Sequence, residues 1–206
     1  MSLINKILNI YLFHRALFLL FAVFTLINPS HADDDPKSIS YEVIVDAGST
    51  GSRLHIYSIE PGDQFPKITE IFYNPIEPGL GTLANAPGQI PVYLGRLFNP
   101  AQRFCYTKQL PCSEMPIYFL ATAGMRLIPD QTQKNMFNSI SMWLQDNTIF
   151  GDVKELSTMS GKKEAAFGWL TAYEADLINN KPTGAFFELG GASMQYAFTV
   201  PKASDS

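Results

Sequence analysis

The sequence IVDAGSTGSR occupies residues 44–53 and joins two segments that have the composition of β-strands. The first segment, residues 41–47, is apolar and β-branched, and the second, residues 53–59, alternates apolar and polar side chains. Residues 49–52 connect the two segments directly after Gly48, so we predict a β-hairpin with a glycine-containing turn.

The turn of this hairpin has the composition of a phosphate-binding loop. Glycines allow a sharp turn in which successive backbone N–H groups point at one anion. The hydroxyl groups of Ser49, Thr50 and Ser52 add donors, and Asp46 at the end of the strand can hold a divalent cation through water. Taken alone, the motif also fits an ordinary hairpin with a polar turn, because short glycine motifs are not specific.

A second hairpin further along the chain repeats this arrangement. Residues 187–195 have the sequence FELGGASMQ, in which an apolar strand and Glu188 are followed by glycines, Ser193 and a second strand. Two acid–glycine–serine hairpins predict one polyphosphate clamped between two loops together with a metal ion. The sequence around Lys162 is not a Walker A motif, because Leu156 stands where that motif requires glycine.

The rest of the sequence alternates strand-like and helix-like segments, which is typical of an α/β protein. We expect further strands at 67–74, 116–120, 185–189 and 193–200. Periodic apolar residues predict helices at 131–145, at 162–178 and at 92–104, the last of which is expected to break at Pro100. A glycine- and proline-rich loop is expected at 78–91. In the helix at 162–178, Leu170 and Tyr173 are expected on the buried face.

Two further motifs lie between the hairpins, namely ATAGMRLI at residues 121–128 and SGKKEAAFGW at residues 160–169. Together with VIVDAGSTGSR and FELGGASMQ they make four motifs in a fixed order. With these motifs the chain resembles the apyrase (GDA1/CD39) family, the nucleoside triphosphate diphosphohydrolases that include the CD39-like ectonucleotidases.

The resemblance implies an actin-like α/β fold with two ribonuclease-H-like lobes, each a mixed sheet with flanking helices. It also implies that a nucleotide substrate and a divalent cation, Ca²⁺ or Mg²⁺, bind between the lobes, and that terminal phosphates of nucleoside tri- and diphosphates are hydrolysed. On this basis we expect the first lobe at residues 41–158 and the start of the second lobe at 159–206.

The resemblance also implies a role for each motif residue. Glu164 would be the general base, Thr122 and Gln195 would orient the nucleophilic water, and Asp46 and Glu188 would hold the metal through water. The implied phosphate-binding residues are Gly48, Ser49, Thr50, Gly51, Ser52, Gly190, Gly191, Ala192 and Ser193.

The chain departs from the family pattern at three points. Glu188 stands where the family usually has Asp, and Ala165 follows the expected base where the family usually has Gly. The fifth family motif is absent, so the second lobe is expected to be incomplete. Two other interpretations therefore stay open: an exopolyphosphatase-like hydrolase that uses the same clamp, and a truncated fragment that binds nucleotide without hydrolysing it or has no function.

The first 32 residues are expected to be a cleaved signal peptide. Lys6 and Arg15 give a positive region, residues 16–27 form an uncharged apolar run, and small residues at Ser30 and Ala32 suit a signal peptidase. The alternative is an uncleaved anchor, but the apolar run is shorter than the ~20 residues that a membrane-spanning helix needs. We therefore expect a secreted or periplasmic protein without a stable membrane anchor, beginning with a polar leader at 33–40.

Export affects how the two cysteines are interpreted. In an oxidising compartment, Cys105 and Cys112 are expected to form a disulfide, in preference to two free buried thiols. The net charge of −4 and the lack of a basic cluster argue against nucleic-acid binding. The oligomeric state does not follow from the sequence.

Overall fold

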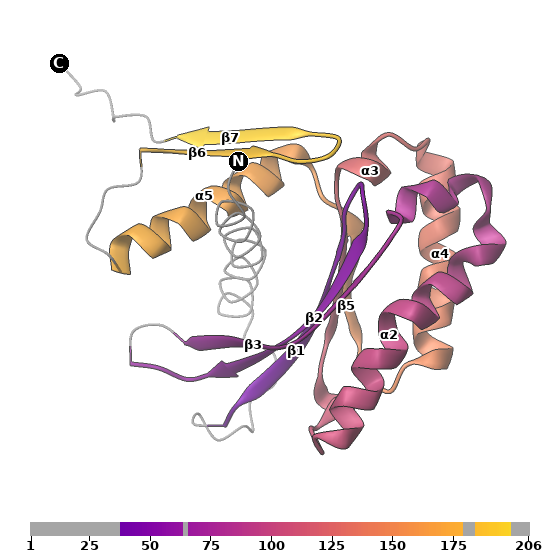
Figure 1. Ribbon diagram of the computed structural model, residues 1–206, viewed down its shortest axis with the longest axis horizontal. Helices are drawn as coiled ribbons and strands as arrows, with labels where there is room; N and C mark the ends of the chain where they lie inside the picture. Colours follow the sequence, from indigo (N-terminus) through magenta and orange to yellow (C-terminus); the bar gives the residue numbers. More distant parts are fainter. Residues whose placement is uncertain (1–37, 64–65, 179–183, 199–206) are drawn as a thin grey trace. The chain divides into compact units, whose positions relative to one another are not determined.

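The computed structural model describes residues 38–63, 66–178 and 184–198. The predicted signal peptide at 1–32 lies outside these residues, as does most of the predicted leader. The described residues form two compact units that divide after Met159, and both are drawn in Figure 1. Within these residues, no helix is long and apolar enough to cross a membrane.

The first unit is built on a five-stranded mixed sheet with the strand order β3-β2-β1-β4-β5. The first three strands along the chain pair antiparallel, whereas β4 and β5 continue the sheet parallel to β1. The bounds of the strands are β1 Ser40–Ala47, β2 Ser52–Glu60, β3 Lys67–Ile76, β4 Ile117–Ala121 and β5 Val153–Thr158.

The parallel pairing brings the carboxyl ends of β1, β4 and β5 to one edge of the sheet. Ala47 is the register partner of Ala121, and the Thr122 N–H donates to the Ala47 carbonyl oxygen at 3.1 Å. The Met159 N–H in turn donates to the Ala121 carbonyl oxygen at 2.7 Å. The turn after β1 and the segment after β4 therefore lie at the same edge.

Two long helices, α2 (Ile90–Thr107) and α4 (Asp130–Asn147), cover one face of this sheet (Figure 1). Alternate residues of the buried strands point toward the helices, because successive side chains of a strand face opposite sides. The core formed in this way includes Val43, Val45, Leu54, Ile56, Leu94, Leu97, Phe98, Phe119, Ile140 and Leu144.

The predicted break at Pro100 is wrong, because α2 continues through this residue. Proline removes the N–H that would bond the carbonyl four residues earlier. In the structure the Nδ2 group of Asn74 on β3 donates to the Arg96 carbonyl oxygen at 3.0 Å and to the Leu97 carbonyl oxygen at 2.8 Å. The side chain of Asn74 thus replaces the hydrogen bond that Pro100 cannot make.

The structure adds elements that the sequence did not indicate. The expected loop at 78–91 contains two 3₁₀ helices, η1 (Leu80–Asn85) and η2 (Pro87–Gln89), and its last residues begin α2. Strand β5 was not predicted, because its sequence VKELST contains only two apolar residues and has no continuous alternation. A short helix, α3 (Ala123–Arg126), follows β4.

Cys105 near the end of α2 and Cys112 at the start of the 3₁₀ helix η3 (Cys112–Glu114) are joined by a disulfide with an S–S distance of 2.03 Å. The bond closes a short loop at the end of α2 that leads into β4.

The second unit contains α5 (Gly161–Ile178) and an antiparallel hairpin of β6 (Ala185–Leu189) and β7 (Met194–Phe198). One face of the hairpin packs on α5, where the ring of Phe186 lies so close to Gly168 that no side chain would fit there.

The buried face of α5 differs from the one expected. Phe167 and Thr171 are buried, whereas Leu170 and Tyr173 are 37% and 40% exposed. Hydrophobic periodicity alone therefore selected the wrong face of this helix.

The other face of the hairpin is apolar and exposed. Side chains with exposed fractions between 55% and 77% form it, and we call it the outer hairpin face: Phe187, Leu189, Met194, Tyr196 and Phe198.

Candidate phosphate-binding and catalytic site

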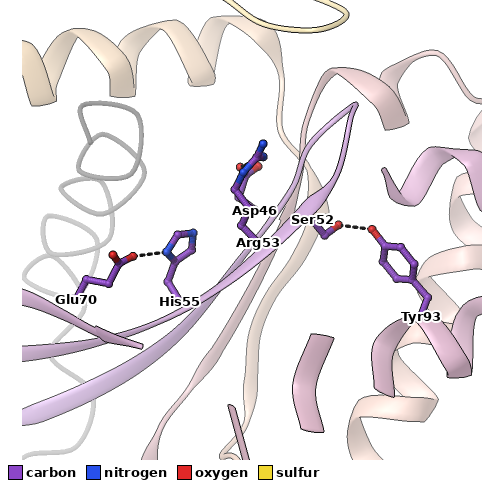
Figure 2. A network of polar contacts seen from close by, with 6 residues as sticks. All are labelled: Asp46, Ser52, Arg53, His55, Glu70 and Tyr93. Carbon is purple, nitrogen blue, oxygen red and sulfur yellow. Dashed lines mark hydrogen bonds and ion pairs between the residues drawn. The ribbon is translucent and has the colours of Figure 1, made fainter. Parts of the chain in front are cut away.

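The first predicted site residue, Asp46, is buried near the end of β1. Its side chain is 1% exposed, and its Oδ2 atom lies 3.2 Å from Nη1 of Arg53, its register partner on β2 (Figure 2). A buried carboxylate is costly unless a cation and hydrogen bonds compensate its charge. A Cβ atom at position 48 would lie 3.1 Å from both Arg53 Nη1 and the Gly51 carbonyl oxygen, so the space at this position is tight.

The turn that follows, residues 48–51, is packed between two other segments of the first unit. A Cβ atom on Gly79 would lie 2.7 Å from the Gly48 carbonyl oxygen and closer still to that of Ser49. A Cβ atom on Gly124 would lie 2.8 Å from the Cα atom of Ser49. We call residues 48–51 the phosphate loop. Gly79 and Gly124, from two distant segments, allow the backbone to approach this loop closely from both sides.

Ser52 directly follows this loop and begins β2. Ser52 was predicted to bind phosphate, but its side chain is fully buried and its Oγ atom lies 2.7 Å from the hydroxyl oxygen of Tyr93 (Figure 2). The cause is the alternation of β2, which directs Arg53 to one face of the sheet and Ser52 with Leu54 to the core. Ser49 is half-buried and Thr50 is exposed, so these two residues are more accessible to solvent than Ser52.

Thr122, a predicted water-orienting residue, lies at the same sheet edge as the phosphate loop. It is 5% exposed and connects β4 to α3, and its carbonyl accepts the Met125 N–H at 3.0 Å. Arg126 of α3 donates from Nη1 to the Met159 carbonyl oxygen at 2.9 Å, which holds α3 against the end of β5. The fold therefore brings Thr122, from a distant part of the sequence, to the edge where Asp46 and the phosphate loop lie.

In the second unit, the predicted base and water-orienting residue are both buried. Glu164 lies in the first turn of α5 and is 7% exposed. The carbonyl oxygen of Ser160 accepts the Glu164 N–H at 3.0 Å, and the Ser160 Oγ accepts the Lys163 N–H at 3.2 Å, so Ser160 caps the helix. Gln195 is 5% exposed and its Nε2 donates to Ser193 Oγ at 2.7 Å.

The second loop positions Glu188 and Gln195 opposite each other. They are register partners in the β6–β7 hairpin, on the face that packs on α5. A Cβ atom on Gly161, the first residue of α5, would lie 4.0 Å from Gln195 Nε2. In the turn, the Gly190 N–H donates to the Ser193 carbonyl oxygen at 2.9 Å, and Gly191 and Ala192 are exposed.

Sequence reasoning missed a polar cluster on the sheet face opposite α2 and α4. His55 Nδ1 lies 2.5 Å from Glu70 Oε1, and the His55 ring stacks on Tyr57 (Figure 2 shows the His–Glu pair). Burial raises the pKa of Tyr57, and the neighbouring Glu70 raises it further. On the adjoining strand, burial raises the pKa of Glu42 to about 8. The alternation of residues 53–59 was the available signal, because it places Arg53, His55 and Tyr57 on one face.

The residues predicted to hold a metal offer suitable donors. Asp46 and Glu188 provide carboxylate oxygens, which Ca²⁺ and Mg²⁺ prefer. Among the described residues, no group of three or more His, Cys, Asp or Glu side chains could hold a metal ion together. Each of the two carboxylates thus has the donor chemistry that such an ion accepts.

Comparison with known proteins agrees with the family resemblance of the four motifs. The profile of the GDA1/CD39 (nucleoside phosphatase) family matches residues 32–206. The chain is 35% identical over 182 residues to a guanosine-diphosphatase of Schizosaccharomyces pombe, covering 85% of this chain and 32% of the relative. It is 33% identical over 195 residues to the nucleoside-diphosphatase mig-23 of Caenorhabditis elegans, covering 82% of this chain and 35% of the relative. The chain thus spans about a third of the length of these relatives.

Among solved structures, the chain is similar to nucleoside triphosphate hydrolases from Neospora caninum. The TM-score is 0.55 at 12% sequence identity, over 78% of this chain and 36% of that chain. This likeness supports the predicted actin-like fold. Given the family profile, the four ordered motifs and the mixed sheet, the chain belongs to the GDA1/CD39 (nucleoside phosphatase) family.

Proposed function

We propose that this chain provides the phosphate-binding and catalytic groups of an exported nucleotidase that removes terminal phosphates from nucleoside tri- and diphosphates. The main support is the gathering of the buried Asp46–Arg53 pair, the phosphate loop and Thr122 at one edge of the sheet. Because the chain spans about a third of its relatives, both the activity and the substrate are part of this proposal.

In the proposed mechanism, backbone N–H groups of the phosphate loop and of residues 190–193 hold the phosphate oxygens. Thr122 and Gln195 orient a water molecule, and Glu164 removes a proton from it as its oxygen attacks the terminal phosphorus. The bond from that phosphorus to the bridging oxygen breaks, and the shortened nucleotide departs with the electron pair.

The proposal includes a divalent cation, Ca²⁺ or Mg²⁺, held through water by Asp46 and Glu188. Such an ion would neutralise negative charge on the phosphates. Glu188 is one methylene longer than the Asp usual in the family, which moves its carboxylate by ~1.5 Å. Binding through water accommodates this displacement more easily than direct coordination, which demands short fixed distances.

The experiment is a phosphate-release assay with ATP, ADP and inorganic polyphosphate, using the wild-type chain and Glu164→Gln. We expect the wild type to act on the nucleotides and the variant to lose about 10²- to 10⁴-fold in kcat while still binding nucleotide, because only the base is removed. Glu114→Gln, which changes an exposed acid on η3, is the matched control and should keep full activity.

Two outcomes would contradict the proposal. Cleavage of polyphosphate but not of nucleotides would favour the exopolyphosphatase-like function. A wild-type chain that folds but releases no phosphate from any substrate would assign hydrolysis to longer members of the family and not to this chain.

Export is a separate part of the proposal. The predicted signal peptide and the disulfide between Cys105 and Cys112 both fit an oxidising, non-cytosolic compartment. Sequencing the N-terminus of the protein recovered from its native host should give Asp33 as the first residue. A protein that keeps residues 1–32 would contradict cleavage and favour an anchored form.

A further inference from the structure

Tyr93 is a buried residue of α2 that none of the four motifs contains. It is 4% exposed, and its hydroxyl oxygen lies 2.7 Å from Ser52 Oγ and 3.0 Å from the Pro78 carbonyl oxygen. Figure 2 shows the phenol extending from the helix to the start of β2. One side chain thus connects a helix, the residue after the phosphate loop and the segment before η1.

The three oxygens can satisfy one another. A hydroxyl donates one hydrogen and also accepts, so Ser52 can donate to Tyr93 while Tyr93 donates to the Pro78 carbonyl. Burial raises the pKa of Tyr93, so its phenol stays protonated and able to donate. In this arrangement, neither the hydroxyl of Ser52 nor that of Tyr93 is buried without a partner.

Both groups bonded to Tyr93 adjoin the phosphate loop. Ser52 directly follows the loop and begins β2, where it pairs with Ala47. Pro78 precedes Gly79, whose backbone packs directly on the carbonyl groups of Gly48 and Ser49. Tyr93 therefore joins the segment that follows the loop to the segment that presses on its middle.

A phosphate loop depends on this kind of restraint. Its backbone N–H groups bind an anion well only when they are already oriented, because ordering a mobile loop on binding consumes part of the binding free energy.

We infer that Tyr93 is a positioning residue for the phosphate loop, which it holds through Ser52 and Pro78, and that Ser52 anchors the loop instead of binding phosphate with its side chain. The inference rests on the proposed function, since it assigns the loop to phosphate. The proposed role differs from simple packing, because it depends on the hydroxyl group of Tyr93 and a phenylalanine would keep only the ring.

The test compares wild type, Tyr93→Phe and Ser52→Ala in the full chain by amide hydrogen exchange. We expect exchange of the residue 48–52 amides to become about tenfold faster in both variants, the factor that corresponds to 1.4 kcal/mol. The amides of Leu97 and Phe98, further along α2, should keep their exchange rates. Tyr57→Phe, which changes a buried tyrosine on the opposite face of the sheet, is the matched control and should leave residues 48–52 unchanged.

Hydrolysis of ADP gives a second measurement. Loss of a prearranged loop weakens ground-state and transition-state binding equally, so Tyr93→Phe should raise KM about tenfold with kcat unchanged. The double variant Tyr93→Phe/Ser52→Ala should be no worse than Tyr93→Phe alone, because Ser52→Ala removes one of the two hydrogen bonds that Tyr93→Phe already removes. If Ser52 bound phosphate directly, its effect would add to that of Tyr93.

Unchanged exchange of residues 48–52 in Tyr93→Phe would overturn the inference, as would additive effects in the double variant. Failure of the proposed function is recognised separately. If the wild-type chain hydrolyses no nucleotide, the proposed function fails, while the exchange rates still decide whether Tyr93 positions the loop.

Discussion

At the scale of single residues, glycines determine how closely the backbone can enclose the phosphate loop. Gly79 and Gly124 leave no space for a Cβ atom, because the backbone of Gly48 and Ser49 occupies it. Gly95 is different: it lies inside α2, and a Cβ atom there would meet only the Asn99 Nδ2 atom at 3.5 Å. A Cβ atom would therefore clash with the backbone at position 79 but would fit at position 95.

We expect Gly79→Ala to lower the free energy of unfolding by about 2 kcal/mol and to raise KM for nucleotide, because the loop backbone must move. Gly95→Ala, the matched control, should raise the free energy of unfolding by about 0.5–1 kcal/mol, since alanine is the better helix residue. Urea denaturation measures both changes. A stable, fully active Gly79→Ala would show that the close packing around the loop is not required.

The raised pKa of Glu42 predicts a pH-dependent stability. Its carboxyl group titrates near 8 in the folded chain but near 4.5 when unfolded. The unfolded state therefore releases its proton first, so the contribution of Glu42 to stability is fully present below pH 4.5 and is lost as the pH rises toward 8. At ~1.4 kcal/mol per pKa unit, the loss amounts to a few kcal/mol.

Glu42→Gln should abolish most of this fall, because the amide stays neutral at every pH. Guanidinium denaturation of wild type and variant at about pH 5 and about pH 8.5 tests it. Glu114→Gln, at an exposed position, should leave the pH dependence unchanged. An equal pH dependence in Glu42→Gln and wild type would mean that another group is responsible.

At the scale of elements, α2 shows why a sequence rule can fail. Pro100 correctly predicts a lost hydrogen bond, but the side chain of Asn74, on a different element, supplies a replacement. No local pattern in the helix contains that information. The strands and hairpins could be predicted from the sequence more readily, because turn residues and the alternation of side chains are local signals.

Asn74→Ala should therefore cost about 1–3 kcal/mol of stability, because it leaves two backbone carbonyls without their side-chain donor. The double variant Asn74→Ala/Pro100→Ala should recover much of this loss, since an alanine at position 100 provides the N–H that bonds the Arg96 carbonyl. Thermal unfolding of the two single variants and the double variant measures the coupling. Additive losses would contradict the proposed replacement.

The disulfide is a second feature at the element scale. Its loop is short, so the chain-entropy model gives a contribution of ~2.5 kcal/mol. Replacing both Cys105 and Cys112 by Ser should lower the free energy of unfolding by about this amount under oxidising conditions. Adding a reductant to the wild type should cause a similar loss, and the double Ser variant should not respond to it.

At the scale of the whole molecule, the order of motifs was sufficient to predict an actin-like mixed sheet, and the structure confirms the mixed sheet. The sequence could not predict strand β5, whose polar composition gives no strand signal, or the buried face of α5, which is set by contact with Phe186. In the candidate site, motif residues were identifiable from the sequence, whereas Tyr93 was not. Its role depends on where α2 lies against the loop.

The outer hairpin face leads to a prediction about association. Contiguous exposed apolar side chains promote contacts between molecules. We expect the purified chain to self-associate as its concentration rises and Phe187→Ser/Tyr196→Ser to shift it toward monomer, as measured by analytical ultracentrifugation. Leu127→Ser, which changes an apolar side chain that is 76% exposed outside this face, is the control. A wild type that stays monomeric at high concentration would refute the prediction.

The close packing around the phosphate loop also bears on the order in which this unit folds. The β1–β2 hairpin that carries the loop joins neighbouring residues and can form early, because its closure is local. Gly79, Tyr93 and Gly124 come later in the chain, so their contacts with the loop require distant segments to arrive. Ordered amides at residues 48–52 would then mark completion of the unit, and nucleotide binding by this loop would be among the last properties gained during folding.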